Sequence, residues 1–352
     1  MPGPLPIADL DLILEHTHEL WPELRGERIF ITGGTGFFGS WLVESFLHAN
    51  RQLNLNAHAT ILTRNPAGFN AKSPHLSGNP ALTLHAGDIS SFDFPTGRFS
   101  HIIHAATDTV SGSSAASQRQ LFASIVDGTE WVLQFAEVAN TSKFLFTSSG
   151  AVYGRQPAEL THVPESYAGA PDSHDTASAY GEGKRAAELM CALHQKAAAH
   201  QNRLFEAKIA RCWAFCGPHL PLDAHFAIGN FIADVIAGRP ISIGGDGTPR
   251  RSYLYAADLA IWLWTILFRG PALVPINVGS AHDISIRELA EAVVKTLAPH
   301  TVVHVAKHAV HGAAPSRYVP SVDRAAKLLG LRPVASLEDA IQKTFTWATS
   351  QG

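Results

Sequence analysis

An apolar strand, a glycine-rich turn and the start of a helix follow one another directly in IFITGGTGFFGSWLVESF, residues 29–46. Three glycines in this turn have GxxGxxG spacing. Glycine permits a positive-φ turn and a close approach of the backbone to a ligand, while a helix N-terminus offers N–H groups and positive potential to a pyrophosphate. We therefore expect a dinucleotide here, although a glycine-rich turn without a ligand has the same local pattern. The residues expected against the cofactor are Gly33, Thr35, Gly36, Phe37, Phe38 and Gly39.

The first half of the chain alternates short β-branched or aromatic runs with longer helical patterns. This alternation predicts an α/β fold with a Rossmann-type doubly wound parallel sheet and helices on both faces. After Gly217 the rhythm changes to loops rich in proline and glycine, which indicates a smaller C-terminal substrate-binding part. Strands are expected at 28–33, 58–64, 81–88, 101–107, 143–149 and 206–215. The expected parts are an N-terminal helical extension (1–27), a dinucleotide-binding Rossmann domain (28–216, with 251–280 returning to it) and a substrate-binding part (217–250 and 281–352).

Composition excludes several classes of partner. The 352 residues carry a formal net charge of −3, so the chain lacks polyelectrolyte character and we expect no nucleic acid. We expect no membrane partner and no signal peptide, because no apolar run is long enough and the N-terminus lacks a basic region before an apolar core. Three cysteines argue against a disulfide framework and for a reducing, cytoplasmic location. Cys212 and Cys216 have no further ligands at suitable spacing, so no metal is expected.

The end of the second strand, ATILTRNP, bears on the choice of coenzyme. An NAD site usually places a carboxylate here for the ribose hydroxyls, but this chain has Thr63 and Arg64. A guanidinium forms charge-assisted hydrogen bonds to a 2′-phosphate, so we expect NADP, with NAD as the alternative if Arg64 is only a surface residue. The other cofactor contacts expected at strand ends are Asp88 at the adenine edge, its neighbour Ile89, and Ala105, Ala106 and Thr107 under the middle of the cofactor.

The segment ASAYGEGKRAAEL contains Tyr180 and Lys184, which lie on one face of a helix because they are four residues apart. An ammonium group close to a phenol lowers the phenol's pKa, which makes it a usable acid or base near neutral pH. A lone YxxxK motif is common by chance. It gains weight here because it follows the glycine-rich turn and a strand ending in serines.

With these segments the chain resembles the extended short-chain dehydrogenase/reductases, in their nucleotide-sugar epimerase/dehydratase branch. The resemblance covers residues 28 to about 333 and rests on TGGTGFFG, HAGD, HIIHAA, TSSGAVYG, YGEGK, GDGTPRRSYLYAADLA and INVGS. It implies that Ser149 is the catalytic hydroxyl that hydrogen-bonds the sugar oxygen, with Ser148 as the near alternative and a substrate contact. It further implies that Tyr180 is the acid/base, and that Lys184 binds the nicotinamide ribose and tunes Tyr180.

Residues 150 and 151 bear on the reaction. Dehydratases of this branch carry an acid pair or a glutamate immediately after the catalytic hydroxyl, to deprotonate C5 and expel water from C6. The related decarboxylases also carry a glutamate there. Gly150 and Ala151 cannot transfer a proton. The resemblance therefore points to 4-epimerases and ketosugar reductases, which need only the serine–tyrosine pair and a hydride.

The segment GDGTPRRSYLYAADLA matches the family segment in which an arginine grips the nucleotide diphosphate. Arg251 takes that position with Arg250 beside it, and bidentate guanidinium–phosphate contacts suit such a substrate, although a surface arginine pair has the same pattern. Ala214 and Ile125 replace asparagines usual in the family, so the hexose stays open. The other substrate contacts that the resemblance implies are Asn230, Phe231, Arg317 and, on the loop expected to cover the sugar, His225.

The expected reaction is hydride transfer at C4 of a nucleotide-diphosphate sugar. An epimerase is expected first, an NADPH-dependent 4-ketosugar reductase second and a 4,6-dehydratase third. A catalytically idle dinucleotide-binding protein is the alternative outside enzymes. The resemblance also implies a homodimer, through helices around residues 115–138 and 178–200. Apolar residues on several faces of the first helix fit this contact, and they equally fit a helix enclosed in the monomer.

Overall fold

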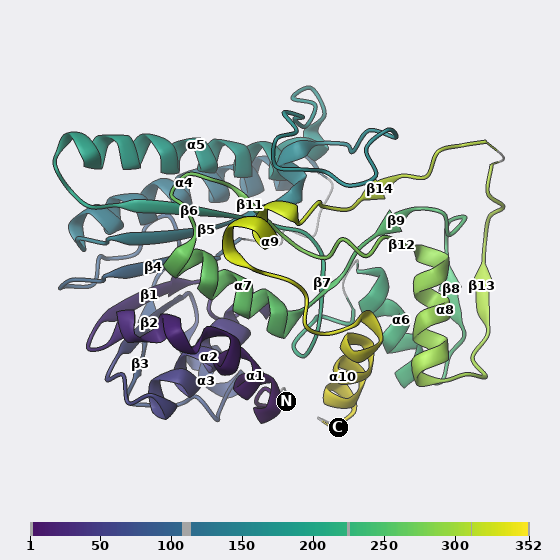
Figure 1. Cartoon of the computed structure of the whole chain (residues 1–352), viewed down its shortest axis with the longest axis horizontal. Helices are drawn as coiled ribbons and strands as arrows, with labels where there is room; N and C mark the ends of the chain where they lie inside the picture. Colours follow the sequence, from purple (N-terminus) through teal and green to yellow (C-terminus); the bar gives the residue numbers. More distant parts are fainter. Residues whose placement is uncertain (1–2, 108–113, 224–225, 311, 351–352) are drawn as a thin grey trace.

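The computed structural model describes residues 3–107, 114–223, 226–310 and 312–350. Its centre is a seven-stranded parallel sheet in the order β3-β2-β1-β4-β5-β6-β11 (Figure 1). The strands are β1 (Arg28–Thr32), β2 (His58–Thr63), β3 (Leu82–Ala86), β4 (His101–His104), β5 (Lys143–Ser149), β6 (Glu206–Cys212) and β11 (Ile276–Val278). The order reverses between β1 and β4, and ligands of such sheets bind at the reversal, beyond the carboxyl ends of the strands. The doubly wound α/β fold predicted from the sequence is confirmed.

The predicted strand 206–215 is divided in the structure. β6 ends at Cys212, and β7 (Phe215–Cys216) pairs instead with β10 (Leu254–Tyr255). The hydrogen-bonding partner of the chain changes between Trp213 and Ala214. The N–H of Trp213 still donates to β11, whereas the carbonyl of Ala214 accepts from the start of β10.

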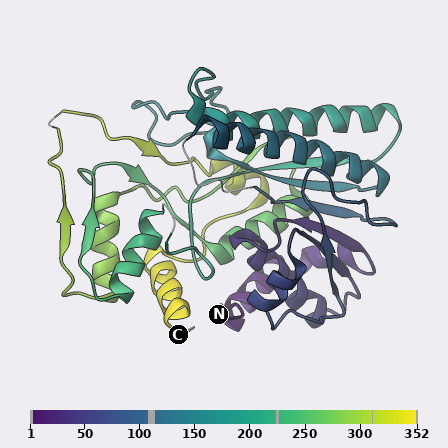
Figure 2. The same ribbon diagram turned by 180° about the vertical axis from the view of Figure 1, so that it is seen from behind.

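Helices cover both faces of the sheet. α2 (Phe37–Gln52) and α7 (Ala256–Arg269) lie on one face, and α1 (Ile7–Thr17) packs against both. α7 is apolar all round and almost wholly buried, as expected for a helix enclosed between a sheet and other helices. α4 (Ala115–Val138) and α5 (Ala179–His200) run side by side along the other face (Figures 1 and 2). The short α3 (Pro66–Lys72), η1 (His18–Leu24), η2 (Gly150–Tyr153) and η3 (Thr176–Ser178) complete this part.

The later segments form a smaller body beside the carboxyl ends of the central strands (Figure 1). It contains α6 (Ala227–Ile236), α8 (Ile286–Leu297), α10 (Leu337–Thr349), β8 (Ile241–Ile243) and β13 (Val303–Val305), while α9 (Asp323–Leu329) packs against β11. A three-stranded sheet joins β9 (Arg250–Arg251), β12 (Ile284–Ser285) and β14 (Arg317–Tyr318). Parallel pairing of β9 with β14 sets Arg251 opposite Tyr318 and Arg250 opposite Arg317.

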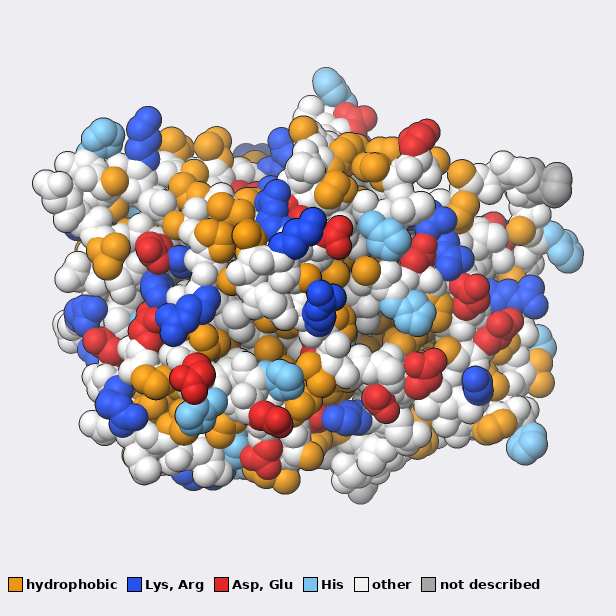
Figure 3. All heavy atoms as spheres, viewed as in Figure 1, with side chains coloured by type: hydrophobic (Ala, Val, Ile, Leu, Met, Phe, Trp, Pro, Cys, Tyr) orange, Lys and Arg blue, Asp and Glu red, His pale blue; other side chains and the backbone are white. Residues whose placement is uncertain are grey.

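The surface shown in Figure 3 mixes charged side chains of both signs with hydrophobic and uncharged ones. Within the described residues, none of the helices combines the length and the apolar character needed to cross a membrane.

Candidate active site

The glycine-rich turn is shaped by close backbone contacts. Gly33 has a φ of +73°, and a Cβ there would lie 2.6 Å from the backbone of Ala105. A Cβ on Gly39 would lie 2.2 Å from the carbonyl oxygen of Gly33. At Gly36 the nearest atom would be 3.6 Å away, and this residue caps α2 without a side-chain acceptor for its first N–H groups. Two glycines are thus required by the fold and the third leaves room for a ligand, which fits a dinucleotide pyrophosphate at this helix N-terminus.

Arg64 and Asp88 lie near one another at the ends of β2 and β3. The Asp88 carboxylate accepts hydrogen bonds from the hydroxyl (2.7 Å) and the N–H (3.0 Å) of Ser90. These bonds and the positive charge of Arg64 hold the pKa of Asp88 below its ordinary value. Thr63 faces inward, and its hydroxyl accepts the N–H of Asn65 at 3.2 Å. The expected adenosine end therefore carries one guanidinium and one ionised carboxylate.

Ser149, Tyr180 and Lys184 converge at the carboxyl end of β5. Ser149 ends the strand, its hydroxyl oxygen accepts the N–H of Ala151 at 3.1 Å, and its side chain is close enough to Tyr180 to act on the pKa of that phenol. Lys184 Nζ donates to the hydroxyl of Thr107 and to the carbonyl of Thr147, both at 2.8 Å. The strand end and the first turns of α5 therefore bring together the three groups predicted as catalytic.

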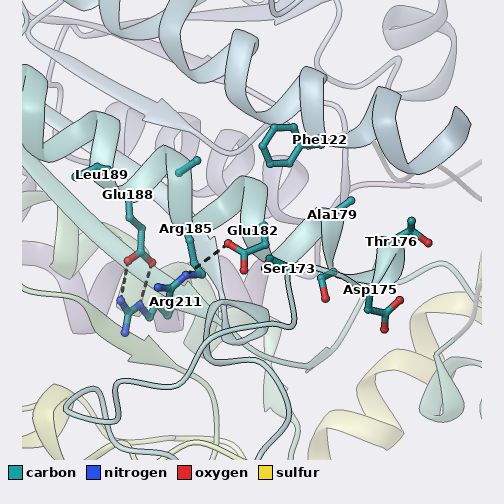
Figure 4. A pocket seen from close by; sticks show the side chains of 12 residues that line it. Phe122, Ser173, Asp175, Thr176, Ala179, Glu182, Arg185, Glu188, Leu189 and Arg211 are labelled. Carbon is teal, nitrogen blue, oxygen red and sulfur yellow. Dashed lines mark hydrogen bonds and ion pairs between the residues drawn. The ribbon is translucent and has the colours of Figure 1, made fainter. Parts of the chain in front are cut away.

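The hydroxyl of Ser148 is engaged elsewhere. It donates to Glu188 Oε1 at 2.6 Å, and Glu188 in turn holds the guanidinium of Arg211 through two bonds of 2.9 and 2.7 Å. Figure 4 shows this carboxylate reaching from α5 to Arg211 at the edge of an open pocket. Of the two serines, the geometry favours Ser149 as the hydroxyl that acts on a substrate.

Burial has the largest influence on the protonation of this site. It lowers the pKa of Lys184 to about 8, and it raises the pKa of Tyr180, a rise that the nearby Ser149 opposes. This corrects the expectation that Lys184 lowers the pKa of the phenol. The ammonium is directed at Thr107 and Thr147 and stands 5.9 Å from the centroid of the Tyr180 ring.

Arg251 and Arg317, both predicted at the phosphates, have different partners in the structure. Arg317 and Arg250 share the carboxylate of Asp283. Arg251 donates to the carbonyl of Arg250 at 2.8 Å, and no carboxylate in the described part of the chain pairs with it. Burial raises the pKa of the neighbouring Tyr318, and the charge of Arg251 opposes that rise. Arg251 is therefore the cation still available to a phosphate, whereas Arg317 already has an anionic partner.

Only part of the segment expected to cover the sugar lies within the described residues. Phe231 is buried in the hydrophobic core on α6, and its neighbour Asn230 is exposed. His225 lies outside the described residues. The structure thus gives Phe231 a packing role and leaves Asn230 accessible.

A comparison with protein-family models identifies one match. Residues 29–279, which contain every element of the catalytic constellation, match the model of the NAD dependent epimerase/dehydratase family. The chain belongs to this family. The recognition made from the sequence motifs is thereby confirmed, and the coenzyme is a nicotinamide dinucleotide.

Known relatives of this epimerase/dehydratase chain carry out different reactions. UDP-glucuronic acid decarboxylase 2 of Arabidopsis thaliana is 27% identical over 318 residues, which cover 90% of this chain and 67% of the relative. The structure of UDP-glucuronic acid 4-epimerase from Bacillus cereus with UDP-glucuronic acid and NAD has a TM-score of 0.75 at 22% identity, over 92% of this chain and 100% of that one. UDP-N-acetylglucosamine 4-epimerase from Methanobrevibacter ruminantium has a TM-score of 0.75 at 21% identity, over 93% and 99%. At these identities the structures show a shared fold.

The position after Ser149 has no room for a side chain in this family member. A Cβ built on Gly150 would lie 2.7 Å from Cδ2 of Trp213 and 2.7 Å from the hydroxyl oxygen of Tyr318. The two rings pack with their centroids 4.4 Å apart. An acidic residue at position 150 would require this aromatic wall to move.

Sequence reasoning did not identify Trp213 or Tyr318 as part of the site. Both come from segments distant from Ser149 in the chain. An aromatic residue on or beside a short strand is ordinarily explained by packing in the core. The available signal was Gly150 itself, because a side chain missing from a buried site implies that another group fills the space.

Proposed function

We propose that the protein is an epimerase that acts at C4 of a nucleotide-diphosphate hexose. The observation that carries the proposal is the Ser149–Tyr180–Lys184 constellation beside a position 150 that has no room for an acid. A nicotinamide coenzyme held at the glycine-rich turn and by Lys184 would supply a reversible hydride acceptor for C4. Tyr180, as the phenolate, takes the C4 hydroxyl proton, and the hydroxyl of Ser149, no longer needed by Tyr180 once that group is a phenol, donates to the developing carbonyl. Lys184 supplies positive charge beside the phenol and a donor toward the coenzyme ribose.

Dehydration and decarboxylation are less well supported by this site. The relatives named as decarboxylases would need the glutamate that the sequence resemblance places after the catalytic hydroxyl, and this chain has Gly150 and Ala151 there. The carboxylates of Glu182, Glu188 and Glu165 are already paired with Arg185, Arg211 and Arg324. An epimerase or a reductase needs none of them.

The proposal is tested with purified protein and a panel of nucleotide sugars without added coenzyme, read by chromatography and mass spectrometry. A new isomer of unchanged mass supports an epimerase that retains its coenzyme. A product lighter by one water, or by carbon dioxide, contradicts the proposal. If no sugar changes until NADPH and a 4-ketosugar are supplied together, the protein is the reductase that Arg64 also favours.

We further propose NADP as the preferred coenzyme, on the basis of Arg64 at the end of β2. Replacing Arg64 by leucine removes the group that would bind a 2′-phosphate. We expect the dissociation constant for NADPH to rise about tenfold or more, with that for NADH nearly unchanged, when both are measured by fluorescence titration. Equal effects on the two coenzymes would contradict a 2′-phosphate contact.

A homodimer through α4 and α5 is also part of the proposal. Leu189 and Leu193 on α5 are 61% and 58% exposed, and Leu189 lines an open pocket together with Phe122 on α4 (Figure 4). Apolar side chains exposed on two adjacent helices are typical of a surface that another copy covers.

Aspartate at both Leu189 and Leu193 should convert the dimer into a monomer, because each charge would be buried against an apolar surface. The measurement is the molar mass by size-exclusion chromatography with light scattering. Val302→Asp serves as the control, since Val302 is 55% exposed and lies in the smaller body. A monomeric parent, or a double variant of unchanged mass, would contradict this interface.

We also propose a cytoplasmic location, which the free, buried state of Cys191, Cys212 and Cys216 supports because thiols persist in a reducing compartment.

A further inference from the structure

The hydroxyl of Tyr318 stands where the side chain of residue 150 would otherwise be. It lies 2.7 Å from the Cβ position of Gly150, and it is close enough to Ser149 for that side chain to act on the pKa of the phenol. It is also near enough to Tyr180 for the charges of the two phenols to interact. A third hydroxyl therefore accompanies the Ser149–Tyr180 pair.

The position of Tyr318 is fixed from several sides. Its ring packs against Trp213 with centroids 4.4 Å apart. The next residue, Val319, donates its N–H to the buried Gln156 at 2.9 Å and accepts the N–H of Val163 at 2.9 Å. A phenol tied in this way keeps its hydroxyl in place without help from a substrate.

The hydrogen-bond capacity of Ser149 determines which phenol donates. A serine hydroxyl has one proton and two lone pairs. One lone pair accepts the N–H of Ala151 at 3.1 Å, so one lone pair and one proton remain for Tyr180 and Tyr318. When Tyr180 acts as the base it is a phenolate and can only accept, so Ser149 donates to Tyr180 and Tyr318 donates to Ser149.

We propose that Tyr318 is a positioning residue that donates to Ser149 and thereby directs the Ser149 proton at the Tyr180 phenolate. Burial raises the pKa of Tyr318, which keeps it protonated and able to donate. The same bond makes Ser149 a better donor to the Tyr180 phenolate. The role of Tyr180 as the base rests on the proposed function, but the chain of three hydroxyls does not.

Tyr318→Phe keeps the ring and removes only the donor. We expect the titration of Tyr180, followed by tyrosinate absorbance in the coenzyme-loaded protein, to move upward by about one pH unit. The titration is assigned to Tyr180 by subtracting, for each protein, the tyrosinate absorbance of its Tyr180→Phe counterpart. For any sugar that the enzyme converts, we expect kcat to fall about tenfold and its acidic limb to shift with the titration, while KM changes little.

Two further variants separate positioning from packing. Tyr153→Phe is the matched control, because Tyr153 stacks on the same Trp213 but donates to Asn277. It should leave the Tyr180 titration in place. In a Ser149→Ala background, Tyr318→Phe should have almost no further effect, since it acts through Ser149.

An unmoved titration in Tyr318→Phe, or its full effect in the Ser149→Ala background, would overturn the inference. A moved titration in a protein that forms no isomer in the sugar panel would uphold the inference and remove the epimerase proposal.

Discussion

Replacing Tyr180 by phenylalanine is expected to lower turnover about 100- to 10,000-fold, because the substrate hydroxyl then has no group to receive its proton. The ring still fits the partly buried start of α5, and Lys184 keeps its bonds to Thr107 and Thr147. We therefore expect coenzyme affinity and the melting temperature to stay near those of the parent. The measurement is kcat on the sugar that the parent converts, with coenzyme binding measured on the same samples.

Tyr255→Phe is the matched control for this loss. Its hydroxyl donates to the buried carboxylate of Asp9 at 2.6 Å, in a contact between α1 and the start of α7 that is separate from the Tyr180 constellation. The control should lose stability by about 1 kcal/mol and retain turnover. Turnover that survives in Tyr180→Phe would contradict the assigned acid/base and would favour a protein that only binds the dinucleotide.

The second large effect concerns the glycine-rich turn, where two glycines should fail in different ways. Gly39→Ala sets a Cβ 2.2 Å from the Gly33 carbonyl oxygen, so we expect unfolding free energy to fall by about 1–3 kcal/mol or more, together with loss of coenzyme. Gly36→Ala has 3.6 Å of clearance within the protein, so its stability should stay within about 1 kcal/mol of the parent. It should nevertheless lose coenzyme, because its methyl group occupies the approach to the pyrophosphate.

The coenzyme content of the purified proteins and their melting temperatures with and without added coenzyme separate the two cases. The parent should melt higher when coenzyme is present, since binding to the folded state stabilises it. Gly36→Ala should melt near the coenzyme-free parent and show no such rise. A normal rise in Gly36→Ala would contradict the placement of the pyrophosphate at this turn.

The fold was predictable because its signals are local. The glycine turn, the apolar strands and the Tyr180–Lys184 spacing each depend on a few consecutive residues. The seven-stranded parallel sheet confirms the fold that these signals predict. The boundary at Trp213 was not predictable, since Phe215 leaves the central sheet to pair with a segment that is distant in sequence.

The less predictable features of the site depend on contacts between distant segments. The pKa of Tyr180 is raised because the folded chain buries the phenol, and a helical spacing of four residues contains no information on burial. Ser148 and Ser149 are equivalent in the sequence until Glu188 is seen to engage the first. Tyr318 reaches the site only through the pairing of β14 with β9.

Reversible hydride transfer at C4 is tested most directly with a nucleotide sugar that carries deuterium at C4. The sugar that the panel shows to be converted is incubated with the purified enzyme, and the position of the label in the product is read by NMR and mass spectrometry. The account predicts an isomer of unchanged mass that keeps deuterium at C4, because the label leaves and returns within one active site. A product with deuterium at another carbon, or with the label lost to coenzyme in solution, would contradict it.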